Sequence, residues 1–200
     1  AIDTGTFPYN TMYRAGSFEY GYDAANNKIN RVSGVATGYP TIYDAQGNDY
    51  GTLTFEDGLA LSSNVGICEL LANYMNYDSL GKYLDRFGFF QETGIPYISE
   101  QTGTKNIDVP MDYLRTGFGQ SSSITVLQLM QAYSAIFNDG VMVRPYVVDS
   151  IEDAKTGEVK KQYSTKAKGT PISKETANKV TEMMKHVLDE GMSGDRFAID

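Results

Sequence analysis

Two hydroxyls and a carboxamide stand side by side at Ser62, Ser63 and Asn64. A hydroxyl and a carboxamide can each donate and accept hydrogen bonds, so these residue types, held between two packed helices, suit the positioning of a reacting molecule. Ser and Asn are also the commonest helix N-cap residues, so one of the serines could simply cap a following helix. The triplet alone leaves both interpretations open.

The residues around the triplet predict two helices that would hold it. Thr54 and Asp57 have the spacing of a capping box, which predicts a first helix starting near Phe55. After the triplet, apolar residues recur at three- and four-residue spacing and predict a second, deeply buried helix. The stripe contains Val65, Cys68, Leu71, Ala72 and Met75, and it is widened by Ile67, Leu70 and Tyr74.

Three runs of sequence together carry a family resemblance. They are AIDTGTFP, TFEDGLALSSNVG and GFGQSSSITVLQLMQAYSAIFNDGVMVRP, in this order along the chain. They resemble the transpeptidase domain of class B penicillin-binding proteins, within the penicillin-binding protein and serine β-lactamase superfamily. The resemblance implies three motifs, Ser-x-x-Lys, Ser-x-Asn and Lys-Thr-Gly, of which only the middle one is found here, as residues 62–64. We therefore expect the chain to be a fragment lying between the other two.

The resemblance implies a role for each candidate site residue. Ser62 would relay a proton from the absent lysine towards the leaving D-alanine, with Ser63 as a spacer. Asn64 would have a catalytic role and would also bind the substrate carbonyl or the side-chain amide of a β-lactam, and Gly119 and Gln120 would complete the substrate-binding set. A serine hydroxyl with no base beside it is not a nucleophile, so the fragment alone is expected to be inactive.

The resemblance also implies partners and a location. The expected partners are peptidoglycan stem peptides, β-lactam antibiotics and, through the parent protein, division or elongation proteins. The parent would be anchored in the bacterial membrane by a helix outside this chain, with its catalytic domain on the extracytoplasmic face. The alternatives are a β-lactam sensor or β-lactamase relative, and a non-catalytic scaffold module of a cell-wall synthesis complex. Apolar helix faces left uncovered in the fragment also predict self-association.

A second triplet, Lys155-Thr156-Gly157, matches the letters of the third family motif. It lies between two strand-like runs, with Gly at the position of a turn that favours positive φ. The sequence therefore predicts a hairpin turn here, not an active-site strand.

Composition excludes several classes of function. The formal net charge of −8 argues against nucleic acid or an anionic membrane surface as the main partner. The single cysteine, Cys68, excludes an internal disulfide, and its apolar stripe favours a core position. The single histidine, His186, has no second ligand at metal spacing, which favours a surface position and argues against a Ser-His-Asp triad. No cofactor or metal site is predicted.

The expected fold is α+β and mostly helical: a partial transpeptidase (β-lactamase-like) fold that lacks most of the central sheet. We expect a surface excursion over 91–115 and a long buried helix from Ile124 to Phe137, capped by Ser123, with Ser173 capping a final helix. The predicted regions are loops and short strands over 1–53, a helical region with the Ser-x-Asn motif over 54–140, a peripheral β-hairpin over 141–170, and a C-terminal helix with the start of a further strand region over 171–200.

Overall fold

A computed structural model of the protein describes residues 1–190. The described chain forms two compact units. The first comprises residues 1–82, 106–122 and 179–190, and the second comprises residues 83–105 and 123–178.

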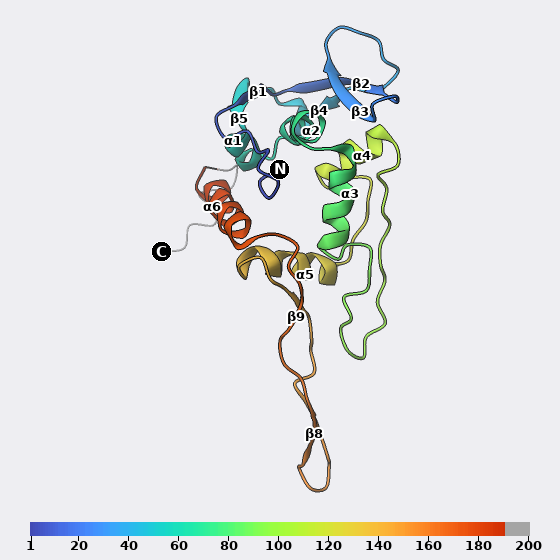
Figure 1. Ribbon diagram of the computed structural model, residues 1–200, viewed down its shortest axis with the longest axis vertical. Coiled ribbons are helices and arrows are strands. Elements are labelled where there is room, and N and C mark those ends of the chain that lie inside the picture. The colour runs from blue at the N-terminus through green and yellow to red at the C-terminus, as the bar shows by residue number, and fades with distance from the viewer. Residues whose placement is uncertain (191–200) are drawn as a thin grey trace. The chain divides into compact units, whose positions relative to one another are not determined.

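The strands of the first unit form two small antiparallel sheets (Figure 1), one with the order β3-β2-β4 and one pairing β1 with β5. The strands are β1 (Met12–Arg14), β2 (Ser17–Asp23), β3 (Lys28–Val32), β4 (Ile42–Tyr43) and β5 (Thr52–Thr54). Along β2, Phe18 and Tyr20 alternate with less buried residues, which is the pattern of a strand with one covered face. The tight turn between β2 and β3 places Asn27 at a φ of +47°, a conformation that Asn tolerates well.

Short helices complete the first unit. They are the 3-10 turn η1 (Ala45–Gly47), α1 (Phe55–Ala60), α2 (Asn64–Glu69), the π-helical η2 (Leu70–Tyr74), α4 (Pro110–Gly117), the start of α3 (Tyr77–Arg86) and the end of α6 (Lys174–Glu190). Val65 and Cys68 on α2 are completely buried, which confirms the predicted burial of this helix and of its cysteine. Burial raises the pKa of the Cys68 thiol far above its ordinary value.

The core of the first unit lies where β2, α2 and α4 meet. Its fully buried members include Phe18, Val65, Tyr113 and Leu114, and Met183 of α6 belongs to the same cluster. Tyr113 stacks on Tyr77 with ring centroids 4.2 Å apart. The helices that flank the Ser-x-Asn triplet therefore rest on a packed core.

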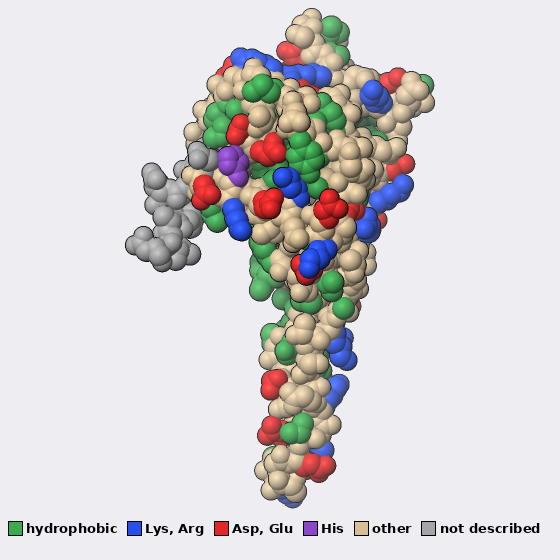
Figure 2. Space-filling model, turned by 60° about the vertical axis from the view of Figure 1, so that its left-hand side comes forward, with side chains coloured by type: hydrophobic (Ala, Val, Ile, Leu, Met, Phe, Trp, Pro, Cys, Tyr) green, Lys and Arg blue, Asp and Glu red, His purple; other side chains and the backbone are tan. Residues whose placement is uncertain are grey.

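The second unit contains α5 (Val126–Phe137) and a long two-stranded ribbon. The ribbon strands are β6 (Met142–Arg144), β7 (Ser150–Glu152), β8 (Val159–Gln162) and β9 (Lys166–Gly169). β6 pairs with β9 and β7 pairs with β8, both antiparallel. Side chains of both charge signs line the ribbon (Figure 2), as expected for an exposed hairpin.

The predicted hairpin turn is confirmed. The carboxylate of Asp153 accepts from the amides of Lys155 and Thr156 at 2.9 and 3.0 Å, and Gly157 has a φ of +69°. The Lys-Thr-Gly letters are thus part of a surface turn. The hairpin expected over 141–170 is formed by two successive strand pairs, β6 with β9 and β7 with β8.

Two predictions over the middle of the chain are wrong. α4 lies inside the expected surface excursion, because Pro110 occupies the first turn of a helix, where its fixed φ is favourable. α5 is capped by Thr125, which forms a capping box with Gln128, whereas Ser123 pairs with Thr104 in an isolated β-bridge.

The face of α5 that was expected to be buried is largely exposed. Met130 and Phe137 are 63% and 61% exposed, while the buried positions include Gln128 and Gln131. Helical spacing identifies residues that share a face, but it does not say whether another element covers that face.

The final helix begins as predicted. The Ser173 hydroxyl accepts from the amide of Thr176 at 3.1 Å. The strand region expected near the C-terminal end lies outside the described residues. None of the helices within residues 1–190 combines the length and the apolar run needed to cross a bilayer.

Candidate functional site

Helix α1 is fixed at its start by Thr54, the predicted N-cap residue. The Thr54 hydroxyl accepts from the amide of Asp57 at 3.1 Å and donates to its carboxylate at 2.7 Å. His186 of α6 also contacts this carboxylate, with Nε2 and Oδ1 3.2 Å apart. The Thr54 hydroxyl, and then His186, hold the pKa of Asp57 below its ordinary value.

Helix α1 ends at Ser62 in a Schellman motif. The amide of Ser62 donates to the carbonyl of Leu59 at 3.0 Å, and the amide of Ser63 donates to the carbonyl of Gly58 at 2.7 Å. Ser62 has a φ of +55°, in the left-handed region where Gly is usual. The serine therefore stands at a position where backbone geometry alone would favour glycine.

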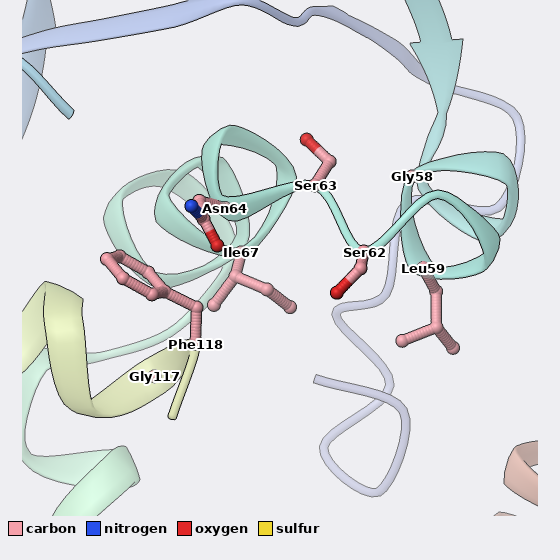
Figure 3. Close-up of a pocket in the computed structure, with 8 residues that line it drawn as sticks. All are labelled: Gly58, Leu59, Ser62, Ser63, Asn64, Ile67, Gly117 and Phe118. Atoms are coloured by element: carbon pink, nitrogen blue, oxygen red, sulfur yellow. The ribbon is translucent and has the colours of Figure 1, made fainter. Parts of the chain in front are cut away.

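Ser62 and Asn64 open into one cavity of about 220 Å³ (Figure 3). The cavity is lined by Gly58, Leu59, Ser62, Ser63, Asn64, Ile67, Gly117 and Phe118. In Figure 3 the Ser62 hydroxyl and the Asn64 carbonyl oxygen point to the side where Phe118 lies, whereas the Ser63 hydroxyl points away. Within residues 1–190 the Ser62 hydroxyl makes no hydrogen bond, so it remains able to donate and accept.

The Asn64 side chain is oriented by the backbone of β4. Its Nδ2 donates to the carbonyl of Tyr43 at 2.9 Å. This bond uses one of the two amide hydrogens, and the carbonyl oxygen keeps its acceptor capacity. The carboxamide therefore has a set direction and unused groups at the cavity.

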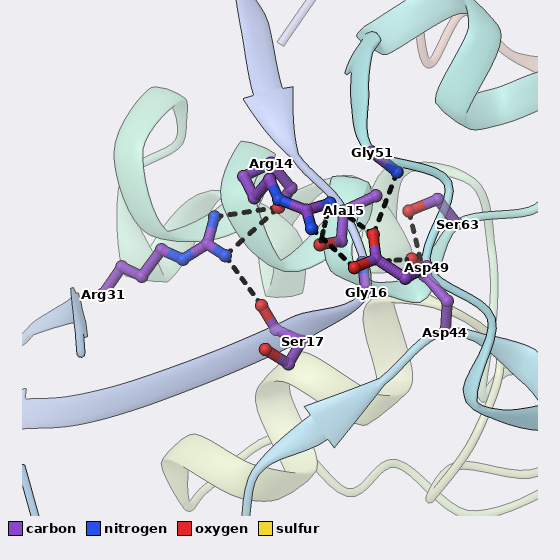
Figure 4. A network of polar contacts seen from close by, with 9 residues as sticks. All are labelled: Arg14, Ala15, Gly16, Ser17, Arg31, Asp44, Asp49, Gly51 and Ser63. Atoms are coloured by element: carbon purple, nitrogen blue, oxygen red, sulfur yellow. Dashed lines mark hydrogen bonds and ion pairs between the residues drawn. The ribbon is translucent and has the colours of Figure 1, made fainter. Parts of the chain in front are cut away.

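Ser63 has a structural role in the same turn. Its hydroxyl accepts from the amide of Gly66 at 3.0 Å, which makes it the N-cap of α2, and donates to the carboxylate of Asp44 at 2.9 Å (Figure 4). Both Ser63 and Asp44 are 2% exposed. The capping interpretation is thus confirmed for Ser63, whereas the hydroxyl of Ser62 is available for chemistry.

Tyr13 of β1 packs between the two helices that flank the turn. A Cβ atom added at Gly58 would lie 2.2 Å from the Tyr13 hydroxyl oxygen, and one added at Gly66 would lie 2.5 Å from it. The hydroxyl is buried without a hydrogen-bond partner in the described chain, and burial raises the pKa of Tyr13 to about 12. The two glycines therefore make room for this ring.

An ion pair supports α2 from its other end. Arg31 of β3 pairs with the carboxylate of Glu69, and its guanidinium also donates to the backbone carbonyls of Arg14 and Ser17 at 3.1 and 2.7 Å (Figure 4). Glu69 is 6% exposed and accepts a second hydrogen bond from Asn73 at 2.6 Å. The pair ties α2 to the sheet.

Gly119 and Gln120, the other predicted substrate-binding residues, follow α4. Both are exposed and neither lines the cavity, whereas Gly117 and Phe118 just before them do. The amide of Gln120 donates to the carbonyl of Arg115 at 2.8 Å. The structure thus brings Ser62 and Asn64 together and places Gly119 and Gln120 beside the segment that closes their cavity.

The next residue, Ser121, has a backbone conformation that is unusual for a residue other than glycine. It keeps a glycine-like φ of +70°, and its hydroxyl donates to the carboxylate of Asp112. A side-chain hydrogen bond therefore accompanies the unfavourable backbone conformation at this position.

The chemistry available at the cavity is positioning and hydrogen bonding. None of the residues that line it is titratable, so no lining group can act as a base. Among the described residues, no group of three His, Cys, Asp or Glu side chains has the arrangement of a metal site.

Sequence reasoning missed Asp44 and the paired glycines Gly58 and Gly66. Asp44 precedes the Ala-Gln-Gly-Asn turn and resembles an ordinary turn residue. Its role depends on contacts 19 and 21 positions away along the chain, and spacing rules give no signal at such distances.

The sequence of the chain matches one protein family. A sequence model described as the penicillin binding protein transpeptidase domain matches residues 13–199. Stage V sporulation protein D of Bacillus subtilis strain 168 is 32% identical over 152 residues, which are 74% of this chain and 23% of that protein. The chain therefore spans about a quarter of that relative's length.

Solved structures are similar over nearly the whole chain. The D,D-transpeptidase domain of a peptidoglycan glycosyltransferase from Eggerthella lenta gives a TM-score of 0.79 at 25% identity, covering 100% of this chain and 48% of that one. Penicillin binding protein 3 from Mycobacterium tuberculosis, solved in complex with aztreonam, gives a TM-score of 0.74 at 25% identity, covering 96% of this chain and 40% of that one. These matches have the α+β fold that was predicted.

Proposed function

Because the chain belongs to the family of penicillin-binding protein transpeptidase domains, we propose that it forms the middle part of a serine-type D,D-transpeptidase. The parent enzyme would cross-link peptidoglycan stem peptides and would be acylated by β-lactams. The observation that carries this proposal is the shared cavity of Ser62 and Asn64, in which an unpaired hydroxyl and an oriented carboxamide are presented together.

In this proposal Ser62 relays a proton. Its hydroxyl makes no hydrogen bond within residues 1–190, so it can accept from a lysine supplied by the rest of the parent and donate to the leaving amine. Asn64, held by the Tyr43 carbonyl, binds the peptide carbonyl of the substrate or the side-chain amide of a β-lactam. Gly119 and Gln120 extend the substrate-binding surface beyond the cavity.

The proposal gives the parent a location and partners. In this proposal the parent works in cell-wall synthesis, which agrees with the peptidoglycan enzymes named among its relatives. Its proposed location is the extracytoplasmic face of the bacterial membrane, and its proposed partners are division or elongation proteins. The 200-residue chain alone is expected to be unreactive, because no residue that lines the cavity is a base.

The test is labelling with a fluorescent penicillin, read by intact mass. Two samples are compared: this chain, and an extended protein in which flanking segments supply the Ser-x-x-Lys and Lys-Thr-Gly motifs. We expect one penicilloyl group on the extended protein and none on the chain, and a much slower reaction after Ser62→Ala in the extended protein. If neither sample labels, the transferase proposal fails and a scaffold function replaces it. Rapid loss of the label by hydrolysis would instead identify a β-lactam-hydrolysing relative.

A further inference from the structure

Two consecutive residues hold the Ser-x-Asn turn: Tyr43, the last residue of β4, and Asp44, which follows it. The carbonyl of Tyr43 accepts from Asn64 Nδ2 at 2.9 Å. The carboxylate of Asp44 accepts from the Ser63 hydroxyl at 2.9 Å and from the amide of Val65 at 3.0 Å, both through Oδ1. One dipeptide therefore holds the Asn64 side chain and both neighbouring residues, Ser63 and Val65.

The Asp44 carboxylate is a buried group whose acceptor positions are used. The side chain is 2% exposed, and its second oxygen accepts from the amide of Gly16 at 3.0 Å. Its three donors are two backbone amides and one hydroxyl, all with defined directions. Removing one partner from such a buried set leaves the others unsatisfied, so the set favours a single geometry.

The dipeptide is itself held by the sheet. Tyr43 pairs with Ser17 and Ile42 with Phe18 in the β2–β4 ladder, and Phe18 is completely buried. Gly16 has a φ of +93°, and a Cβ atom there would lie 2.9 Å from Cγ of Asp49. The φ of Gly16 lies in the region that favours glycine, and in this conformation its amide donates to Asp44. The position of Asp44 is determined by rigid elements outside the turn.

We propose that Asp44 is a positioning residue of the transpeptidase reaction. It acts through Ser63 and Val65 and sets the directions in which Ser62 and Asn64 face the cavity. The proposal rests on the proposed function, because it assigns Asp44 a role in the reaction given to Ser62 and Asn64. A purely structural role would affect the amount of folded protein but not the reactivity of each folded molecule.

The test is Asp44→Asn in the extended protein that carries all three family motifs. Asn preserves the shape of the side chain, but its amide group would face at least one N–H or O–H donor, so one hydrogen bond is lost. The matched control is Asp49→Asn, which removes the same charge from the same loop. Asp49 is paired with Arg14 at the surface, where its side chain is 52% exposed, and it does not contact the turn.

The readouts are the rate of acylation by a fluorescent penicillin at saturation and the final fraction labelled. We expect Asp44→Asn to slow acylation at least about tenfold, since small misplacements of reacting groups have effects of this size, while the final fraction labelled stays near that of the wild type. Asp49→Asn should react within about twofold of the wild-type rate, because its partners do not hold reacting groups.

Each outcome separates the inference from the proposed function. If the wild-type extended protein does not label, the proposed function fails, and the role of Asp44 fails with it. If the wild type labels and Asp44→Asn reacts at the wild-type rate, only the positioning role is overturned, even if less protein is folded. If Asp44→Asn yields no folded protein, Ser63→Ala carries the test. It removes one donor to Asp44 together with the N-cap of α2, so its rate is measured on the folded fraction alone. Slower acylation of its folded fraction supports the proposal, and the wild-type rate overturns it.

Discussion

The two neighbouring serines of the turn are expected to respond to substitution in opposite directions. Ser62 lies at the end of α1 with a φ of +55° and no hydrogen bond from its hydroxyl within residues 1–190. Ser63 has a φ of −70°, caps α2 and donates to the buried Asp44. Ser62→Gly should therefore stabilise the chain, and Ser63→Ala should destabilise it.

The magnitudes follow from these contacts. A left-handed conformation costs an L-residue about 1–2 kcal/mol, and Gly loses about 0.5–1 kcal/mol more in backbone entropy on folding. The net gain for Ser62→Gly is therefore between about 0 and 1.5 kcal/mol. Ser63→Ala loses an N-cap, at about 1 kcal/mol, and removes a donor from a buried carboxylate, at about 1–3 kcal/mol. We expect a loss of about 2 kcal/mol or more for this variant.

The assay is urea unfolding of the 200-residue chain, followed by circular dichroism. Ser62→Ala serves as the control, because it removes the hydroxyl but keeps the strained backbone, and its unfolding free energy should equal that of the wild type. A loss of more than about 1 kcal/mol in Ser62→Ala, or lower stability in Ser62→Gly, would refute the reasoning, since a hydroxyl that holds the turn would show such a loss. In the extended protein, Ser62→Gly should be more stable and yet react poorly with penicillin.

Four further outcomes are expected. Gly58→Ala should lower the unfolding free energy by about 1–3 kcal/mol, because the new methyl group would overlap the Tyr13 hydroxyl. In urea unfolding, adding Tyr13→Phe to the same chain should restore part of this loss. The pKa of Asp57 is held below its ordinary value of 3.8. The stability that this carboxylate contributes is therefore present above pH 3.8 and is lost as the pH falls through the lower pKa of the folded state. Asp57→Asn should lack this loss when urea midpoints are compared across the acid range. Cys68 should not react with a thiol-directed disulfide reagent until the chain is unfolded, since its thiol is completely buried and its pKa is raised; reaction in the native chain would contradict this. The exposed apolar face of α5 should drive concentration-dependent association that Met130→Lys reduces, and a wild-type monomer by light scattering at high concentration would count against it.

Three predictions that depend on neighbours in the chain were confirmed, whereas the cap expected at Ser123 lies at Thr125 instead. The Thr54 N-cap, the Ser173 cap and the turn at Gly157 each involve hydrogen bonds or dihedral angles within a few residues. Local composition contains the information for such features, because caps and turns are stabilised by the residues that form them.

Features set by the rest of the fold could not be predicted. The contacts of Asp44 join residues 19 and 21 positions apart, and nothing near Asp44 in the sequence marks it as different from a turn residue. The exposure of Met130 depends on whether another element lies on α5, which periodicity does not contain. The sequence identified Ser62 and Asn64 as candidate site residues, and the structure adds the groups that hold the turn between them.

The turn between β7 and β8 offers a place to attach a reporter group. Its hydrogen bonds are local, from the amides of Lys155, Thr156 and Gly157 to Asp153 and from Asp153 to Glu158, and it belongs to a different unit from Ser62. Because Cys68 is completely buried, a cysteine introduced by Lys155→Cys would be the accessible thiol among residues 1–190. A dye coupled there would allow self-association to be followed by fluorescence without altering the residues that line the cavity.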